Sequence, residues 1–298
     1  MKEMTERLTG CGTALVTPFT KDGALDEPAL RKLVDWQIKQ GIHFLVPCGS
    51  TGEAATMTPD EHRRVVEITV EQAKGRVAIV AGAGSNDTAK AVATSKEMKA
   101  AGATHLLHVS PMYNKPPQRG IIEHFKRIAS ATDLPIIVYN VPGRTGGNIE
   151  AKTTLALAQV KHIVAVKEAS GNLGQIIDIL KDRPPHFSVL SGDDEMTLTV
   201  MAAGGDGVIS VVSNATPKAM AQLCDVASKG DFAAARKIHF QLLPWMRAAF
   251  VESNPIPVKA ALAMMGKIGN HLRLPLVPLA ETHNETVRAA LRSAGALT

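Results

Sequence analysis

The hydrophobic positions of the chain form eight short, almost uniformly apolar segments that alternate with longer amphipathic ones. An apolar run of roughly four to eight residues is typical of a strand buried on both faces, as in a parallel sheet covered by helices. The predicted strands are residues 12–19, 44–49, 77–82, 105–110, 135–141, 163–167, 187–191 and 207–212.

The segments between these runs have the periodicity of helices. In residues 26–39, apolar side chains recur at spacings of three and four, which places them on one helix face. Thr58, Pro59 and Glu61 predict a helix start, with Thr58 as N-cap, proline in the first helical position and Glu61 closing a capping box. Further helices are predicted at 86–101, 118–130, 151–158, 174–180, 196–203 and 217–227.

Eight strand–helix units in succession predict an α/β fold, a (β/α)8 TIM barrel with extra C-terminal helices. No GxGxxG follows the first strand, which disfavours an open dinucleotide-binding sheet. We expect residues 1–231 to form the catalytic barrel and residues 232–298 a helical extension packed on it, since no linker-like composition separates the two. The extension predicts helices at 232–252, 255–266 and 282–293.

Composition narrows the class of protein. The 298 residues are 45% hydrophobic and carry a net charge of +5, but the basic residues are scattered among acidic ones, so we expect no nucleic-acid partner. No apolar stretch is long enough to span a membrane, and the first ten residues, MKEMTERLTG, predict no secretory signal. The widely spaced Cys11, Cys48 and Cys224 predict neither disulfides nor a metal site and suit a cytoplasmic protein.

Polar side chains follow several predicted strands at the point where each strand ends. They are Ser50, Thr51, Tyr113, Tyr139, Arg144 and Lys167. In a (β/α)8 barrel the carboxyl ends of the strands meet on the face that carries the active site. The sequence therefore predicts that these side chains converge there.

Lys167 is the most informative of them, because it ends the apolar strand segment IVAVK. Burial of an amine disfavours its charged form and can lower its pKa from ~10.4 toward ~7–8, which yields a nucleophile able to attack a ketone. The alternative is a lysine whose stem is buried and whose head reaches solvent. The neighbouring hydroxyls favour catalysis. Tyr139, one of only two tyrosines, could relay protons, or could be an amphipathic rim residue.

Several segments resemble, in order along the chain, the motifs of the dihydrodipicolinate synthase and N-acetylneuraminate lyase superfamily. They are GSTGE (49–53), SPMYNKP (110–116), YNVPGRTG (139–146), VKEASGN (166–172) and SGDD (191–194). ESNPIPVKAAL (252–262) and LRLPLVPL (272–279) are similar to the synthase branch. The resemblance covers about residues 12–279 and implies a cofactor-free aldolase-type enzyme that condenses pyruvate with L-aspartate 4-semialdehyde to give 4-hydroxy-tetrahydrodipicolinate in lysine and diaminopimelate biosynthesis.

By this resemblance, Lys167 forms an imine with pyruvate, and Tyr139, Thr51 and Tyr113 form a proton relay. Tyr113 reaches into the site of a neighbouring subunit, within a homotetramer built as a dimer of dimers. The backbone N–H groups of Ser50 and Thr51 hold the pyruvate carboxylate.

The second substrate has its own expected contacts. Arg144 holds the carboxylate of aspartate semialdehyde, a role that suits a bidentate guanidinium. Gly192 and Ile209 line the pocket, with the Ile209 carbonyl facing the substrate. No metal is implied.

Alternatives remain open at this point. A sibling lyase acting on a 2-keto-3-deoxy sugar acid or a hydroxy-keto acid would use the same lysine, and the Ser50–Thr51 pair, where the synthase branch usually has two threonines, does not discriminate. Arg144 does, because sugar-acid lyases generally lack it. A catalytically dead barrel is disfavoured by the retained relay residues. A metal- or phosphate-dependent barrel lacks ligand clusters.

The resemblance also predicts weak or absent feedback inhibition by lysine. Of the positions that hold this effector between two subunits, His62 and Asn86 are kept, whereas Lys90 replaces a glutamate. Pro59 replaces a second histidine, and Met112 an aromatic residue.

Three further motifs have modest expected roles. The GGDG segment (204–207) predicts a helix–strand turn rather than a phosphate site. Glu53 is expected to bond backbone in its own loop rather than act as a base. Asp193 and Asp194 are expected to order the loop after the seventh strand.

Overall fold

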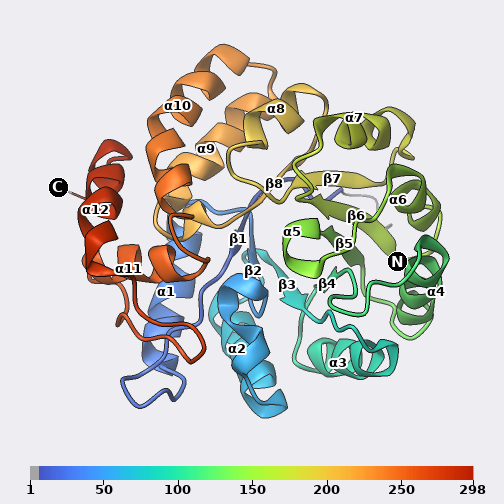
Figure 1. Ribbon diagram of the computed structural model, residues 1–298, viewed down its shortest axis with the longest axis horizontal. Coiled ribbons are helices and arrows are strands. Elements are labelled where there is room, and N and C mark those ends of the chain that lie inside the picture. Colours follow the sequence, from blue (N-terminus) through green and yellow to red (C-terminus); the bar gives the residue numbers. More distant parts are fainter. Residues whose placement is uncertain (1–6, 298) are drawn as a thin grey trace.

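The predicted barrel is present and closed. A computed structural model describes residues 7–297. The expectation of no secretory signal rests mainly on residues 1–6, which lie outside the described residues, as does Thr298. Eight parallel strands pair in sequence order, and the first pairs with the last (Figure 1). They are β1 (Gly10–Ala14), β2 (Phe44–Val46), β3 (Ala78–Gly82), β4 (His105–Val109), β5 (Ile136–Asn140), β6 (Ile163–Glu168), β7 (Ser188–Ser191) and β8 (Gly207–Ser210).

Helices surround this barrel on the outside (Figure 1). They are α1 (Glu27–Lys39), α2 (Pro59–Ala73), α3 (Thr88–Ala100), α4 (Gln118–Ala129), α6 (Ala151–Leu157), α7 (Leu173–Asp182), α8 (Thr197–Ala202) and α9 (Pro217–Ser228), whereas the short α5 (Pro142–Thr145) is not part of this outer ring. The capping box predicted for α2 is formed, with both the Thr58 and the Glu61 side chains bonded to backbone N–H groups. The four-residue α5, in the loop after β5, and several short 3-10 turns were not predicted.

The first strand is shorter than predicted. Residues 12–19 read as one apolar run, but β1 ends at Ala14. Leu15, Val16 and Phe19 are nevertheless fully buried, because Leu15 and Val16 belong to the main hydrophobic core and the Phe19 ring is covered by side chains of the C-terminal extension. An apolar run therefore predicts that these residues are buried. Whether they also form a strand depends on whether a neighbouring strand pairs with them.

Alternation along the strands divides the interior into two layers. A small cluster that includes Tyr139, Ala165, Leu190 and Ile209 fills the inside of the barrel. A larger cluster fills the space between strands and helices. Since successive strand residues point to opposite faces, Lys167 shares the inward side of β6 with Ala165.

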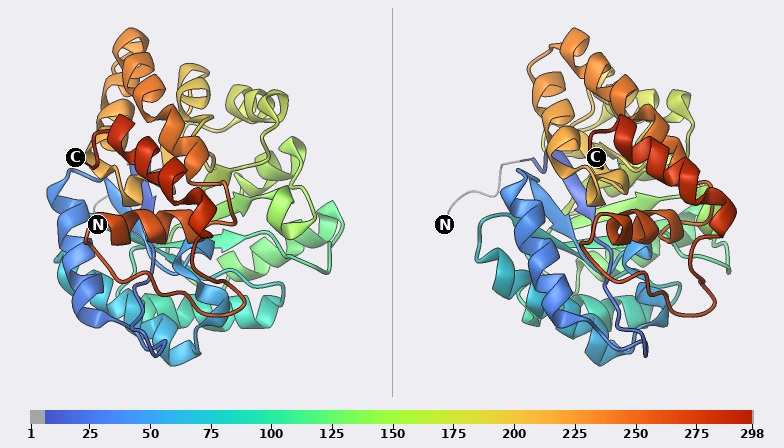
Figure 2. Two further views of the ribbon diagram at one scale, coloured as in Figure 1. Left: turned by 60° about the vertical axis from the view of Figure 1, so that its left-hand side comes forward. Right: turned by 90° about the vertical axis from the view of Figure 1, so that its left-hand side faces the viewer.

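Three further helices form the C-terminal extension and lie beside the barrel (Figure 2). They are α10 (Phe232–Ala248), α11 (Ile256–Met264) and α12 (Asn284–Ser293). Trp245 of α10 is fully buried, and its indole N–H donates to the Val212 carbonyl at 3.1 Å. Trp245 thus connects α10 to the segment that follows β8. Among residues 7–297, no helix has the length and apolarity needed to cross a bilayer.

Candidate active site

Lys167 lies inside the barrel at the carboxyl end of β6. It is buried and pairs in register with Tyr139 of β5, and its Nζ lies 4.0 Å from the centre of the Tyr139 ring. Burial lowers the pKa of Lys167 to about 7; Asp194 opposes this shift and Arg144 adds to it. A substantial fraction of this amine is therefore neutral at pH 7, so it can act as a nucleophile.

The direction of the Lys167 side chain is fixed by its neighbour along the strand. Glu168 points to the other side of β6, where its carboxylate accepts hydrogen bonds from the Asn140 side chain, at 3.0 Å, and from the Ser170 backbone N–H, at 2.7 Å. Gln175 of α7 donates to it as well, at 3.1 Å. These bonds hold the end of β6 and leave Lys167 facing inward.

Tyr139 is also buried, and burial raises the pKa of its phenol to about 12, with Arg144 opposing the shift. The phenol is therefore protonated at neutral pH, so it can donate a proton and take one back. The predicted convergence of Lys167 and Tyr139 is present in the structure.

Ser50 and Thr51 lie in a short 3-10 turn, Ser50–Gly52, that follows β2. Ser50 is exposed and Thr51 is buried. The Thr51 hydroxyl accepts a hydrogen bond from the side-chain amide of Asn254 at 2.9 Å. Asn254 lies in the C-terminal extension just before α11, and sequence reasoning did not single it out.

Arg144 lies in α5 and is exposed. One of its guanidinium nitrogens donates to the backbone carbonyl of Asn254 at 3.1 Å. Asn254 thus contacts both Thr51 and Arg144. The charge of Arg144 also contributes to lowering the pKa of Lys167 and opposes the rise in the pKa of Tyr139.

Tyr113 is separate from this group in the single chain. Its side chain is 89% exposed, and its backbone has a φ of 70°, in the left-handed region. Its backbone N–H donates to the Thr145 carbonyl at 3.2 Å, so its loop is attached to the turn that carries Arg144. An aromatic ring this exposed beside a site is available to a second copy of the chain.

Gly192 and Ile209 lie at the ends of β7 and β8. The Ile209 side chain belongs to the cluster inside the barrel that also contains Tyr139. A Cβ on Gly192 would come within 2.7 Å of the Ala169 Cβ and 3.1 Å of the Lys167 side chain. Only glycine therefore leaves Lys167 undisturbed.

Asp194 and the GGDG segment have the roles expected from the sequence, whereas Glu53 does not. Asp194 accepts from the Val211 and Val212 backbone N–H groups, at 3.0 and 3.1 Å, and orders its loop as expected; burial raises its pKa to about 6. The GGDG segment joins α8 to β8 as a turn. Glu53, in contrast, does not bond the backbone of its own loop through its side chain.

The Glu53 carboxylate instead reaches the C-terminal extension. It forms a fully buried ion pair with Lys259 of α11 at 2.7 Å and accepts from the Arg273 backbone N–H at 3.1 Å. The prediction failed because these partners lie more than two hundred residues away in sequence, so no local pattern could indicate them.

The residues described contain no group of three or more His, Cys, Asp or Glu side chains placed to hold a metal ion. Cys11, Cys48 and Cys224 are buried and free. Burial raises the pKa of the Cys48 thiol well above its usual range, so this thiol is not a nucleophile near neutral pH.

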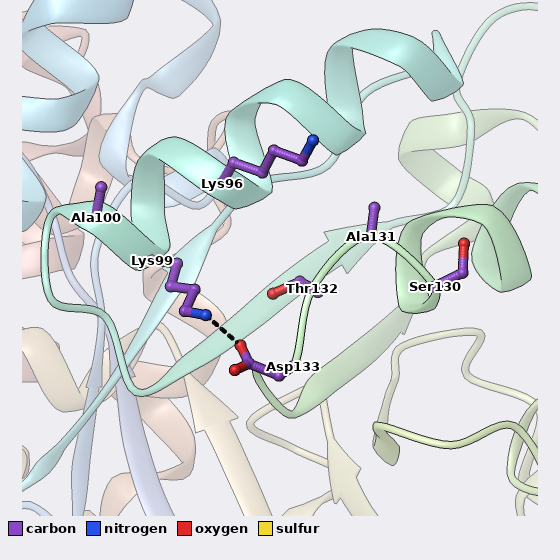
Figure 3. A pocket seen from close by; sticks show the side chains of 7 residues that line it. All are labelled: Lys96, Lys99, Ala100, Ser130, Ala131, Thr132 and Asp133. Carbon is purple, nitrogen blue, oxygen red and sulfur yellow. Dashed lines mark ion pairs between the residues drawn. The ribbon is translucent and has the colours of Figure 1, made fainter.

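A surface pocket lies elsewhere and is unrelated to these residues. Figure 3 shows Lys96, Lys99 and Ala100, from the end of α3, facing residues 130–133 after α4. Both helices end where the next strands begin, so the pocket is at the opposite end of the barrel from Lys167. Its Lys99 is paired with Asp133 at 2.7 Å.

A closed (β/α)8 barrel with a buried lysine of lowered pKa beside a tyrosine, at the carboxyl end of the strands, defines the class of barrel enzymes that act through a lysine amine. The sequence profile described as the Dihydrodipicolinate synthetase family matches residues 7–294. The chain belongs to this family, which confirms the resemblance noted in the sequence, and it is an enzyme.

Individual relatives agree with this assignment. The chain is 52% identical over 292 residues to the 4-hydroxy-tetrahydrodipicolinate synthase of Koribacter versatilis, covering 98% of this chain and 97% of that one. Dihydrodipicolinate synthase from Thermotoga maritima superposes with a TM-score of 0.96 at 44% identity, covering 98% and 100% of the two chains. A chloride-inhibited dihydrodipicolinate synthase from Acinetobacter baumannii, solved with pyruvate, gives 0.95 at 43% identity, with 97% and 99% coverage.

Proposed function

We propose that this chain condenses pyruvate with L-aspartate 4-semialdehyde through a Schiff base on Lys167, giving 4-hydroxy-tetrahydrodipicolinate for diaminopimelate and lysine biosynthesis. The observation that carries the proposal is the inward-facing Lys167 with its pKa of about 7, in contact with the Tyr139 ring. The names of the relatives support the choice of substrates.

The first half of the reaction uses pyruvate alone. The neutral Lys167 amine adds to the ketone carbon, and loss of water gives an imine. Loss of a methyl proton converts the imine into an enamine. Each step moves a proton, and the Tyr139 and Thr51 hydroxyls, with Tyr113 of a neighbouring copy, are the relay we assign to that task. The backbone N–H groups of Ser50 and Thr51 hold the pyruvate carboxylate.

The second half adds the aldehyde. The enamine carbon attacks the aldehyde carbon of aspartate semialdehyde, and the new alkoxide takes a proton from the relay. The amine of the bound substrate then adds to the imine carbon, closes the ring and releases the Lys167 amine. Arg144 holds the substrate carboxylate, while Gly192 and the Ile209 carbonyl line the pocket. The imine on Lys167 is the electron sink, so no step calls for a cofactor or a metal.

Borohydride reduction in the presence of pyruvate, followed by peptide mass mapping, tests the central step. We expect the reduced pyruvate adduct on Lys167, and none in Lys167→Ala or Lys167→Arg, because a guanidinium does not form this imine. Pyruvate-dependent labelling at another lysine, or no labelling, would exclude the mechanism. Rates measured side by side with aspartate semialdehyde and with sugar aldehydes would distinguish the proposed reaction from that of a sibling lyase.

The exposed Tyr113 supports a proposal about assembly. We propose a homotetramer built as a dimer of dimers, in which Tyr113 of one copy enters the site of its partner. Its 89% exposure in the single chain leaves the ring available for this contact. Light scattering should give four copies, and a fully active monomer would refute the arrangement. The free, buried cysteines fit our further proposal of a cytoplasmic enzyme.

We also propose that residues 1–231 form the catalytic barrel and residues 232–298 an appended helical unit. The second unit would contribute to the site through the hydrogen bond that Asn254 donates to Thr51.

A further inference from the structure

The turn that carries Thr51 receives a hydrogen bond of fixed direction from the C-terminal extension. Asn254 is 95% buried, and its side-chain amide nitrogen lies 2.9 Å from the Thr51 hydroxyl oxygen. An amide nitrogen donates and does not accept, so the Thr51 oxygen is the acceptor in this contact. The hydroxyl proton of Thr51 is therefore free to be donated to a different group.

The other polar atoms of Asn254 have separate roles. Its backbone carbonyl accepts from the Arg144 guanidinium at 3.1 Å. Its side-chain oxygen is buried and has no hydrogen-bond partner among the described residues. The carboxamide is thus oriented by Thr51 through its nitrogen, while Arg144 is attached to the backbone and is independent of the side chain.

We propose that Asn254 is a positioning residue that sets the direction of the proton relay by occupying an acceptor site of the Thr51 hydroxyl. This rests on the function proposed above, in which Thr51 passes protons. With one lone pair engaged by the amide, the hydroxyl presents its proton and its remaining lone pair to the reacting groups. A group that accepted from Thr51 would instead draw that proton out of the relay.

Asn254→Asp is the discriminating variant, because aspartate has nearly the same shape but only accepts when ionised. We expect kcat to fall on the order of 10- to 100-fold, part of what a general acid–base group contributes. Asn254→Ala, which removes the donor without adding an acceptor, should cost less, about 2- to 10-fold. The KM for aspartate semialdehyde should change by less than about 3-fold in both variants, since Arg144 bonds the backbone.

A double-mutant cycle with Thr51→Val tests whether Asn254 acts through Thr51. In that background neither Asn254 variant should lower kcat by more than about 2-fold further. The matched control is Asn284→Asp, which makes the same change in the same extension at the start of α12, and it should stay within about 2-fold of the wild type. Borohydride trapping with pyruvate reports whether each variant still assembles the Lys167 site.

Exchange of the pyruvate methyl hydrogens for deuterium, followed by NMR, separates this proposal from the proposed function. It requires imine, enamine and proton relay but no aldehyde. A wild-type enzyme that exchanges pyruvate hydrogens without condensing aspartate semialdehyde would contradict the proposed second substrate, and Asn254→Asp should still slow the exchange. Asn254→Asp with wild-type kcat, or with the same loss in the Thr51→Val background, overturns the positioning role. Should Asn254→Asp fail to fold, the cycle with Asn254→Ala decides.

Discussion

At the scale of single residues, the site depends on placing an amine where water is scarce. Lys167 and Tyr139 are neighbours across two strands, and burial acts on both in the direction that keeps the group neutral. Asp194 and Arg144 then adjust the lysine in opposite senses. The pKa of Lys167 thus depends on its burial and on two charged side chains, one in the loop after β7 and one in α5.

The pH dependence of the pyruvate half-reaction should follow this amine. Because the pKa of Lys167 is lowered to about 7, the reactive neutral form increases as the pH rises through 7. We expect kcat/KM for pyruvate to rise across this range and to level off above it. Rates measured from pH 5 to 10 would show the rise; a midpoint near 10 would mean that the free enzyme holds Lys167 in an ordinary solvated state.

Arg144 should affect the binding of aspartate semialdehyde much more than the binding of pyruvate. Arg144→Ala should raise the KM for aspartate semialdehyde by roughly 10- to 150-fold, the effect of losing a charge-assisted contact of about 1.5–3 kcal/mol, and the KM for pyruvate much less. Removal of this cation should also move the acidic limb of the pH profile upward, since Arg144 lowers the pKa of Lys167. Equal changes in both Michaelis constants would mean that Arg144 only supports its loop.

At the scale of elements, the turn after β2 is built by two distant parts of the chain. Glu53 has a φ of 57°, a conformation that non-glycine residues rarely adopt, and its buried carboxylate is held by Lys259 of α11. The Lys259 ammonium also donates to the Thr17 carbonyl at 2.9 Å and lies 4.5 Å from the Phe19 ring centre. One lysine thereby joins α11, the segment after β1 and the turn that carries Thr51.

Removing half of this pair should be costly. Lys259→Met leaves a buried, unpaired Glu53 and should lower the free energy of unfolding by about 3–5 kcal/mol. Lys259→Met combined with Glu53→Gln should recover part of the loss, because no charge then remains unpaired. Lys39→Met is the matched control: Lys39 pairs with Asp35 on the surface, and its loss should cost less than about 1 kcal/mol. Similar urea midpoints for Lys259→Met and Lys39→Met would disprove the role of the buried pair.

Elements that depend on local patterns were predictable, and contacts between distant segments were not. Lys167 could be found because a charged residue at the end of an apolar strand is unusual in itself. Asn254 was not singled out, although it lies in the motif ESNPIPVKAAL, because it follows no barrel strand and reaches Thr51 only through contacts between segments far apart in sequence. The end of β1 was mispredicted for a similar reason, since Phe19 is apolar and buried without being in a strand.

At the scale of the whole molecule, two side chains of the region expected to bind an inhibitor between two copies already form hydrogen bonds within one chain. His62 bonds the Gly82 carbonyl at 2.8 Å, and the Asn86 side chain donates to the Met112 carbonyl at 3.2 Å. Lys90 is exposed on α3. A free lysine bound in this region would therefore meet the cation of Lys90.

We accordingly expect weak or no inhibition by L-lysine. Repulsion between its ammonium and that of Lys90 amounts to about 1–4 kcal/mol at ~4 Å, depending on the effective dielectric. Initial rates at saturating pyruvate, with lysine raised to millimolar levels, should stay close to the uninhibited value, and Lys90→Glu should increase sensitivity. Strong inhibition of the wild type at sub-millimolar lysine would show that Lys90 points away from the effector.

The bond from Asn254 to Thr51 spans 203 positions of sequence. During synthesis, all eight strands leave the ribosome before this residue does, and the barrel could close while the turn after β2 still lacks its amide donor and its Lys259 partner. The nascent enzyme would then be folded before it is competent. Full activity would therefore appear only after Asn254 and Lys259 have emerged, because until then the turn that carries Thr51 lacks both contacts.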